Sequence, residues 1–550
     1  MTTSHPRPIL VAVAWPYANG SLHLGQMAGA YLPADIFARY HRLAGNRVLM
    51  VSGSDVHGTP ITVRADQEGV PPREVVDRFH PQFLRIWDEL GISFDLFTTT
   101  MTDNHREVTW DLFRTLHDNG CIGTKTTEQF YDVEASRFLP DRYVEGTCPH
   151  CGYDRARGDQ CESCGRTLDP EELVDPRSRF TGTTPETRET EHYFILLSKL
   201  QNQLLDWLEG REGWRNHVIN WALGFVREGL HDNAISRDLD WGVPLPPEFD
   251  TIGEGKRIYV WFEAVIGYLS ASKEWAQRQG DPDRWKDWWE DPSSGSYYFI
   301  GKDNIPFHAV FWPAYLMGYG SLNLPTDVPA NQYVTFKGAK ASKSAGVGRP
   351  VLEYLDEFEP DALRFALAAN LPEQQDSDLT DDELVRRIND ELVATWGNLV
   401  NRLVSMTHRW FDGEVPSPGT LDDRDRGILD AVDAVLEEVS GQIGRVELRA
   451  GLRTALRGAQ EVNGYLNATE PWRTAKDDLE RTATTLFVAL NAVNGLKVAF
   501  APYLPFTTER LHATLGQDGS VAAGGWARTE LVPGTALGEA EPLYRKVETA

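Results

Sequence analysis

Residues Ile9 to Gln26, ILVAVAWPYANGSLHLGQ, decide the fold of this chain. The apolar run Ile9 to Ala14 predicts a buried strand, the Pro and Gly residues after it predict a turn, and the stretch from Leu24 to Leu43 predicts a helix. A second apolar strand is predicted over Val48 to Ser52. This rhythm is typical of a parallel α/β sheet, and ligands of doubly wound sheets bind where such strands end.

The rhythm is interrupted and then resumes further along the chain. From Cys121 to about Leu239 the sequence breaks into short charged segments, and strand-like runs return at Ile258 to Trp261 and at Tyr297 to Ile300. We interpret the interruption as an insertion in a Rossmann-like, doubly wound parallel domain. The expected parts are 1–120 and 241–325 for the two halves of that domain, 121–240 for a connective insertion, 326–380 for a linker subdomain and 381–550 for an all-α domain.

The last third of the chain is predicted to be helical. Beyond about Gln374, long amphipathic stretches follow one another, with loops predicted at Pro416 to Gly419 and at Asn467 to Trp472. Sustained helical periodicity with short connections indicates a helical bundle. The amphipathic stretches are Asp381 to Trp410, Ile428 to Ile443, Leu448 to Leu466 and Thr484 to Phe500.

Composition and charge limit the classes of protein that remain. The 550 residues are 41% hydrophobic and 25% charged, and no apolar run approaches the roughly 18 residues of a membrane span. The N-terminal residues do not suit a signal peptide, so we expect a cytoplasmic protein with no membrane partner. The formal net charge of -27 repels polyanions on average, so nucleic-acid binding would require Arg and Lys gathered on one face. Solvation, or adaptation to a salty cytoplasm, is the simpler explanation of the acidity.

Four of the five cysteines form a metal-binding pattern. They follow the spacing C-x2-C-x9-C-x2-C, each pair is followed by Gly, and two such turns complete a tetrahedral zinc site. Because sulfur fills all four positions, one structural Zn²⁺ is expected rather than a catalytic ion. His150 lies inside the first turn and could substitute as a ligand, and Cys121 stands alone. The four ligands are Cys148, Cys151, Cys161 and Cys164.

Two short segments predict a nucleotide site. His23 and Gln26 are three residues apart at the predicted helix start, so both side chains leave one face, and Gly25 lets a nucleotide approach the backbone. Far downstream, KGAKASKSAG over 337–346 places Lys340 and Lys343 in a small-residue loop that suits a triphosphate. Taken singly, either segment also fits a helix cap or a solvated loop.

Together the two segments resemble a known pair of motifs. HLGQ and KASKS are similar to the HIGH and KMSKS motifs of class I aminoacyl-tRNA synthetases, with Gln26 in place of the second His and Ala341 in place of Met. Because Gln26 can still donate a hydrogen bond, a phosphate contact is expected to survive there. Five further segments resemble methionyl-tRNA synthetases, and the similarity covers nearly the whole chain: AWPYANGSLHLG, SGSDVHGTPI, SRDLDWGVP, YVWFEAVIGYLSAS and YFIGKDNIPFHAVFWPA.

The resemblance implies three sets of binding residues. In a methionine pocket, aromatic edges attract the sulfur and a carboxylate, Asp55, pairs the α-ammonium; in the family, Leu and Pro often stand at the positions of Trp15 and Val265. The methionine residues are Ala14, Trp15, Tyr17, Asp55, Trp261, Ala264, Val265, Tyr268 and His308. The ATP residues are His23, Gln26, Lys302, Asp303, Lys340 and Lys343, with Asp303 placed to accept from ribose hydroxyls. The anticodon residues are Asn398, Arg402 and Trp472, which could stack on an unpaired base.

The resemblance also implies the reaction and the partners. It implies a ligase that forms methionyl-adenylate from methionine and Mg²⁺-bound ATP and transfers methionine to elongator and initiator tRNA(Met), reading the CAU anticodon. The implied catalytic residues are His23, Gly25 and Gln26 at the reacting phosphorus, and Lys340 and Lys343 at the pyrophosphate. Because no further domain follows, a monomer is expected.

Two alternatives stay open. One is a class I synthetase for another amino acid, but those for Ile, Val and Leu usually carry a large editing insertion that this length excludes. In the methionine enzyme, the same lack of room implies that any proofreading against homocysteine occurs in the synthetic site itself. The other is a non-catalytic, zinc-containing tRNA-binding paralogue, which the replacement at Gln26 makes conceivable.

Overall fold

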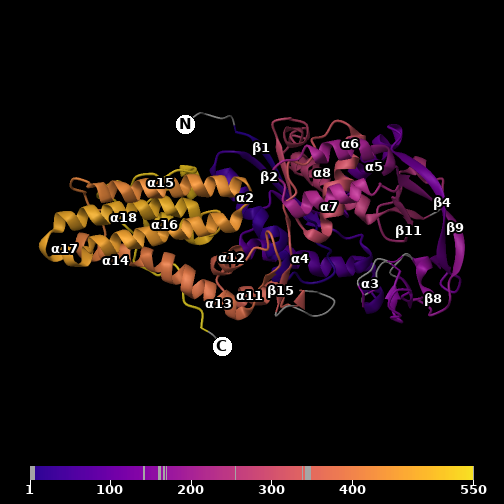
Figure 1. Ribbon diagram of the computed structural model, residues 1–550, viewed down its shortest axis with the longest axis horizontal. Helices are drawn as coiled ribbons and strands as arrows, with labels where there is room; N and C mark the ends of the chain where they lie inside the picture. Colours follow the sequence, from indigo (N-terminus) through magenta and orange to yellow (C-terminus); the bar gives the residue numbers. More distant parts are fainter. Residues whose placement is uncertain are drawn as a thin grey trace.

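The computed structural model describes residues 6–139, 143–158, 161, 163–164, 168, 170–253, 255–336, 339–340 and 348–548. Figure 1 shows an elongated molecule with an α/β half at one end and a bundle of long helices at the other.

A five-stranded parallel sheet forms the centre of the α/β half. It consists of β1 (Pro8–Val13), β2 (Arg47–Ser54), β3 (Leu96–Thr99), β13 (Gly295–Gly301) and β14 (Ala330–Asn331). The strand order is β14-β13-β1-β2-β3, and every neighbouring pair is parallel. The order reverses beside β1, as it does in a doubly wound sheet, so the predicted fold class and its three sheet strands around 9–14, 48–52 and 297–300 are confirmed.

Helices cover both faces of this sheet. Side chains of β1 alternate between two hydrophobic cores, with Ile9, Val11 and Val13 in one and Leu10 and Ala12 in the other. The first core includes α2 (Leu32–Leu43) and α4 (Pro72–Leu90), with α3 (Thr59–Glu68) beside them. The second includes α5 (Asp103–Asp118), α8 (Val260–Arg278) and α10 (Trp312–Tyr319). Burial on both faces explains why the strands are continuous apolar runs.

The strand predicted at Ile258 to Trp261 is wrong. β12 (Lys256–Ile258) pairs antiparallel with β11 (Ser236–Asp238) in a separate two-stranded sheet, and α8 begins at Val260. From Phe262 to Ser272 every residue of α8 is buried. The apolar run Ile258–Trp261 spans the end of β12 and the start of α8, and so short a run does not distinguish a buried strand from a buried helix.

The insertion contains two antiparallel sheets. The long strands β4 (Ile122–Asp132) and β9 (Glu186–Ile195) form a ribbon, edged by β5 (Arg137–Phe138) and β10 (Asn233–Ala234). The second sheet, of β6 (Val144–Thr147), β7 (Ala156–Arg157) and β8 (Val174–Ser178), has a small core of its own. The helices α6 (Leu197–Glu209) and α7 (Asn216–Arg227) instead pack in the second core of the parallel-sheet domain.

Long helices form the other half, as predicted. α13 (Asp381–Arg386) continues through a π-helical stretch, Arg387–Gly397, into α14 (Asn398–Phe411), and α15 (Asp423–Gly444), α16 (Leu448–Thr469) and α18 (Leu479–Phe500) pack with it. The loop predicted at 416–419 is confirmed. The loop predicted at 467–472 is wrong, because α17 (Pro471–Asp477) follows α16 after one residue, Glu470. With a φ of 45°, this single left-handed residue ends α16.

The central helix of the bundle is α18. It is long and apolar enough to cross a membrane by length and composition, the only such helix among the described residues, and its apolar window is wholly buried in the protein. Polar residues such as Asn491 and Asn494 interrupt this run, which is why counting consecutive apolar residues overlooked it. Apolar residues on every face are typical of a core helix.

Short elements join the two halves. These are α11 (Val351–Glu357), α12 (Pro360–Ala369) and a small sheet of β15 (Val334–Phe336), β16 (Ala339–Lys340) and β17 (Ser377–Asp378). α12 packs against α2 and α4 on one side and α16 on the other, and α19 (Pro505–Thr514) packs beside it. The bundle and one face of the parallel sheet therefore share a single hydrophobic core.

Candidate active site

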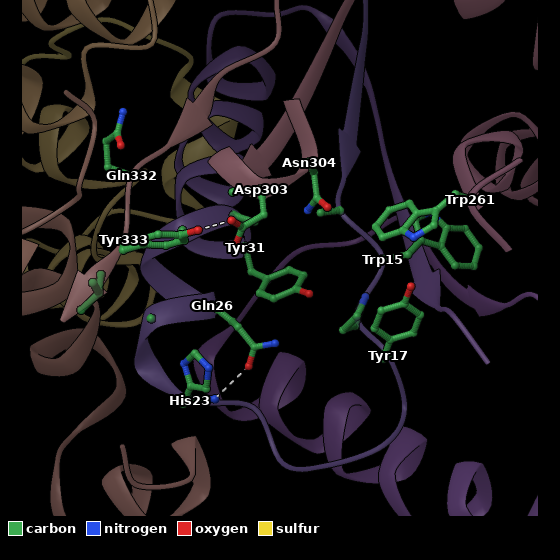
Figure 2. A pocket seen from close by; sticks show the side chains of 17 residues that line it. Trp15, Tyr17, His23, Gln26, Tyr31, Trp261, Asp303, Asn304, Gln332 and Tyr333 are labelled. Carbon is green, nitrogen blue, oxygen red and sulfur yellow. Dashed lines mark hydrogen bonds between the residues drawn. The ribbon is translucent and has the colours of Figure 1, made fainter. Parts of the chain in front are cut away.

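A cavity of about 290 Å³ opens at the carboxyl ends of β1 and β13. Figure 2 shows Trp15, Tyr17 and Trp261 on one side of it and His23 and Gln26 on another. Eight residues implied by the resemblance line it: Ala14, Trp15, Tyr17, His23, Gly25, Gln26, Trp261 and Asp303. The sequence analysis missed several others: Gly29, Ala30, Tyr31, Asn304, Gln332, Tyr333 and Val334. Residues 332–334 carry no motif, and they reach the cavity because β14, just before them, pairs with β13.

The HLGQ segment starts the helix that borders the cavity. His23 has an extended backbone with φ of -120°, and its N–H donates to Gln26 Oε1 at 3.2 Å, so the Gln26 side chain caps α1 (Leu24–Gln26). A π-helical turn, Met27–Tyr31, then joins α1 to α2 and brings Gly29 to the cavity wall. Small residues at a helix start allow a phosphate to approach unpaired backbone N–H groups.

The nine residues implied for methionine are partly in the cavity wall and partly behind it. Ala14, Trp15, Tyr17 and Trp261 line the cavity, whereas Asp55, Ala264, Val265, Tyr268 and His308 are buried. Trp15 packs edge-on against Tyr268 with ring centroids 6.4 Å apart, so Tyr268 of the buried set directly supports the wall. Trp261 stacks on Phe307, with ring centroids 3.8 Å apart and ring planes 6° from parallel. The sequence analysis did not single out Phe307.

A hydrogen-bonded pair fixes Tyr268 behind the wall. Burial lowers the pKa of His308 to about 4, so its ring is neutral at pH 7. Its Nδ1 lies 2.9 Å from the carbonyl oxygen of Asn304 and therefore carries the proton, which leaves Nε2 to accept from the Tyr268 hydroxyl at 2.7 Å.

Asp55 belongs to a buried network of ionisable groups that includes Glu263 and His57. Burial, and then the nearby Glu263 carboxylate, raise the pKa of Asp55 to about 8. Glu263 Oε1 lies 2.9 Å from His57 Nδ1, and Glu263 Oε2 lies 3.3 Å from His105 Nε2. Burial opposes the charge of Glu263, but the two histidines outweigh it and lower its pKa. Burial likewise lowers the pKa of His57, but the carboxylates of Glu263 and Asp55 prevail and raise it.

Of the residues implied for ATP on the side of the cavity opposite the aromatic wall, the structure places some in the lining and others outside it. Asp303 lines the cavity and accepts a hydrogen bond from the Tyr333 hydroxyl. Lys302 instead forms an ion pair with Asp376 at 2.9 Å and lies over the Tyr333 ring. The backbone of Lys340 belongs to β16, paired with β15 next to the cavity, and Lys343 lies outside the described residues. The roles of both lysines therefore stay predictions.

Two of the three residues implied for the anticodon meet at the end of the bundle farthest from the sheet. The Arg402 guanidinium of α14 lies 5.5 Å from the centre of the Trp472 ring of α17, and Figure 1 shows these helices at that end. Asn398 lies one helical turn before Arg402 and is exposed. The arrangement offers a cation and an aromatic plane, which together suit an unpaired base.

The four predicted zinc ligands meet beside the second insertion sheet. Their Sγ atoms lie within 4.8 Å of one another, with 3.9 Å between Cys148 and Cys164 and 3.6 Å between Cys151 and Cys161. Zn–S bonds of about 2.3 Å in a tetrahedron require sulfur separations of about 3.8 Å. The cluster therefore fits a structural zinc ion. Gly152, with φ of 74°, closes the first turn by donating to the Cys148 carbonyl at 3.0 Å.

Comparisons with known proteins agree with this geometry. Residues 9–404 match the family described as tRNA synthetases class I (M), and residues 415–550 match the anticodon binding domain of methionyl tRNA ligase. The chain is 51% identical to a methionine–tRNA ligase of Roseiflexus castenholzii, over 99% of this chain and 97% of that protein. It is 45% identical to one of Corynebacterium glutamicum, over 98% and 97%. A solved structure of Mycobacterium tuberculosis methionyl-tRNA synthetase with methionyl-adenylate superposes with a TM-score of 0.81, at 29% identity, over 98% of this chain and all of that one.

A doubly wound sheet with a nucleotide-sized cavity at its carboxyl edge, joined to a helical anticodon-binding domain, is the architecture of a class I aminoacyl-tRNA synthetase. The relatives and the family matches span nearly the whole chain, so it belongs to the methionine–tRNA ligase family.

Proposed function

We propose that this protein activates methionine with ATP and transfers it to tRNA(Met), both elongator and initiator. One observation carries the proposal: a single cavity joins the His23–Gly25 helix start to the aromatic wall of Tyr17 and Trp261. A helix start suits a phosphate and an aromatic wall suits a thioether, so both substrates of an adenylation fit side by side.

Two transfers follow from this arrangement. A methionine carboxylate oxygen attacks the α-phosphorus of ATP, and the bond to pyrophosphate breaks. A hydroxyl of the terminal adenosine of tRNA then attacks the carbonyl carbon, the bond to AMP breaks, and the hydroxyl proton leaves to solvent. The residues act mainly by positioning and by stabilising charge: His23, Gly25 and Gln26 at the reacting phosphate, Asp303 at the ribose, and Asp55 at the amine. Mg²⁺ bound with ATP would neutralise phosphate charge, and Lys340 and Lys343 would hold the departing pyrophosphate.

The bundle supplies the proposed recognition of tRNA. Arg402 and Trp472 would stack on and hydrogen-bond an unpaired anticodon base, with Asn398 one turn away.

We also propose that the protein acts in the cytoplasm as a monomer, which sedimentation of the purified protein would test. The Cys148–Cys164 cluster would hold one zinc ion in a structural role.

Methionine-dependent ATP–pyrophosphate exchange, measured across a panel of amino acids, tests the proposal. We expect exchange with methionine and at least tenfold less with any other amino acid. Exchange driven best by another amino acid would overturn the methionine assignment, and tight tRNA binding without exchange would support a non-catalytic paralogue. Replacing Lys343 by Ala should lower the exchange rate, and an unchanged rate would contradict its role.

A further inference from the structure

Tyr31 is a residue of the cavity wall to which neither the motifs nor the family resemblance gives a role. It lines the cavity at the carboxyl ends of β1 and β13, although it is only 3% exposed. Its ring packs against Trp87 of α4 with centroids 4.6 Å apart. Its hydroxyl forms no hydrogen bond with any residue that the structure describes. Because buried polar groups normally have a hydrogen-bond partner, this hydroxyl is available to a ligand in the cavity.

The π-helical turn directs Tyr31 towards the cavity. In an α-helix, a residue five positions after Gln26 would point about 140° away from it. In the turn Met27–Tyr31 the Leu32 N–H instead donates to the Met27 carbonyl, five residues back. This pattern places residues five apart nearly above one another, so Gln26 and Tyr31 both reach the cavity. Such π-helical turns are frequent at functional sites.

The Tyr31 side chain lies between the two ends of the proposed substrate arrangement. Figure 2 shows its ring between Gln26, beside the phosphate end, and Tyr17 of the aromatic wall, with the hydroxyl pointing towards the aromatic side. Burial, and then the hydroxyls of Tyr298 and Tyr31, raise the pKa of Tyr268, so the Tyr31 hydroxyl lies near the methionine end. With phosphate at the helix start and the thioether at the aromatic wall, the methionine carboxylate and the α-phosphorus meet between them.

We propose that the Tyr31 hydroxyl donates a hydrogen bond to the methionine carboxylate oxygen that does not attack ATP. The inference rests on the proposed function and adds a catalytic residue to it. In methionyl-adenylate this oxygen is the carbonyl oxygen. During transfer the tRNA hydroxyl attacks the carbonyl carbon, and an electron pair of the C=O bond moves to this oxygen. The pair returns as the bond to AMP breaks, so a donor here stabilises charge that develops in the transition state.

A neutral phenol suits this position. Burial raises the pKa of Tyr31, so the hydroxyl keeps its proton and remains a donor at neutral pH. Because the phenol carries no charge, its interaction with the carbonyl oxygen of the adenylate is modest and strengthens as negative charge builds up there. His23 and Gln26 lie at the phosphate end of the cavity, so Tyr31 supplies a donor on the other side of the reacting bond.

Tyr31→Phe tests this role, with Tyr315→Phe as the matched control. The first change removes one hydroxyl and leaves the ring on Trp87, so the fold should be preserved, which denaturant unfolding checks. Tyr315 of α10 is also deeply buried, at 4% exposure, packs on Phe262 and does not line the cavity.

Three measurements are made on the full-length protein. The first is binding of methionine alone. The second is binding of 3-(methylthio)propylamine, which keeps the thioether and the amine of methionine but has no carboxylate. The third is single-turnover transfer to tRNA from preformed methionyl-adenylate. The two binding measurements separate a contact with the carboxylate from a contact with the rest of methionine.

We expect Tyr31→Phe to slow transfer about a hundredfold, because one donor to a developing oxyanion contributes an effect of about that size. Methionine binding should weaken about tenfold, since a hydrogen bond to a charged group is lost. Binding of the amine without a carboxylate should not change. Tyr315→Phe should match the unaltered protein in all three measurements.

Three results would overturn the proposal. They are transfer at the unaltered rate in Tyr31→Phe, equal weakening of both ligands, and unchanged methionine binding with a raised KM for ATP, which would assign the hydroxyl to phosphate. If methionine drives no exchange in the unaltered protein, the proposed function itself fails, so the two failures are distinguishable.

Discussion

Two fully buried carboxylates, Glu263 beneath the cavity and Asp35 at the junction of the two halves, hold their charge in different ways. Glu263 is paired with two histidines, His57 and His105. Asp35 is paired with two arginines, Arg364 at 2.7 Å and Arg39 at 2.8 Å. Histidine titrates near neutral pH, whereas arginine stays charged. The junction therefore keeps one charge state at physiological pH, while the network under the site can respond to pH.

The Arg364 guanidinium connects elements from both halves of the molecule. Besides Asp35 of α2, it donates to the backbone carbonyls of Leu90, Pro502 and Tyr503, at 3.0, 3.0 and 2.8 Å. Burial alone would raise the pKa of Asp35, but its arginine partners and Ser93 hold that pKa at about 2. The ionised carboxylate thus stabilises the fold above its unfolded pKa of 3.8, and this contribution is lost only as the pH falls from about 4 towards 2.

Breaking the junction should have the largest effect on stability. Arg364→Met leaves Asp35 buried without its fully buried partner, and we expect the free energy of unfolding to fall by about 3–5 kcal/mol. Exchange activity per folded molecule should stay within twofold, because the Arg364 hydrogen bonds among the described residues all go to groups outside the cavity wall. Denaturant unfolding of the full chain, with exchange assayed in its absence, measures both.

The matched control is Arg528→Met, which removes a partly exposed pair with Asp433. Exposed pairs contribute about 0–1 kcal/mol. If the two variants lose the same stability, the junction pair has no special weight and the comparison fails.

Breaking the Glu263 network should lower activity more than stability, the opposite of what is expected at the junction. Glu263→Gln removes the charged acceptor of His57 and His105, and hydrogen bonds to charged groups contribute about 1.5–3 kcal/mol. We expect kcat/KM for exchange to fall by about ten- to a hundredfold, because α8 also carries Trp261 of the cavity wall. Glu263→Asp, which keeps the charge, should recover part of the activity. Activity that is unchanged while stability drops would show that Glu263 serves the fold alone.

The sequence allowed one of these two regions to be anticipated better than the other. Asp55 and Glu263 lie in segments that carry the family resemblance, although Glu263 follows just after the stretch 258–261, where a helix start was predicted as a strand. Asp35 and Arg364 lie 329 residues apart and neither belongs to a quoted motif, so nothing local links them. Short-range patterns predicted the β1 strand, its turn and the zinc ligands, because those depend on neighbouring residues. The 332–334 wall of the cavity depends on the pairing of distant strands, which periodicity does not encode.

The pH dependence of methionine binding sharpens the contrast further. With a pKa of about 8, Asp55 is mostly protonated at pH 7 in the free protein and must lose its proton to pair with the methionine ammonium. We therefore expect the KM for methionine to rise about tenfold, or about 1.4 kcal/mol, for each pH unit below 8. Exchange kinetics between pH 6 and 9 measure this slope. Asp55→Asn should flatten it at a high KM, and a slope that persists in Asp55→Asn would assign the titration to another group.

The smallest effects should come from the serines that each network recruits. Ser93 Oγ donates to Asp35 at 2.6 Å and accepts from Arg42 at 2.7 Å. Ser270 Oγ lies 2.9 Å from His105 Nδ1 and donates to the Gly267 carbonyl at 3.0 Å, so Ser93→Ala and Ser270→Ala each remove two hydrogen bonds. Each should lower the free energy of unfolding by about 1 kcal/mol. Only Ser270→Ala should also change the pH profile of exchange, since His105 is joined through Glu263 to His57, whereas Asp35 keeps both arginines. A pH profile that shifts equally in both variants would mean that the junction and the site titrate as one unit, and the distinction between an arginine-held and a histidine-held carboxylate would not hold.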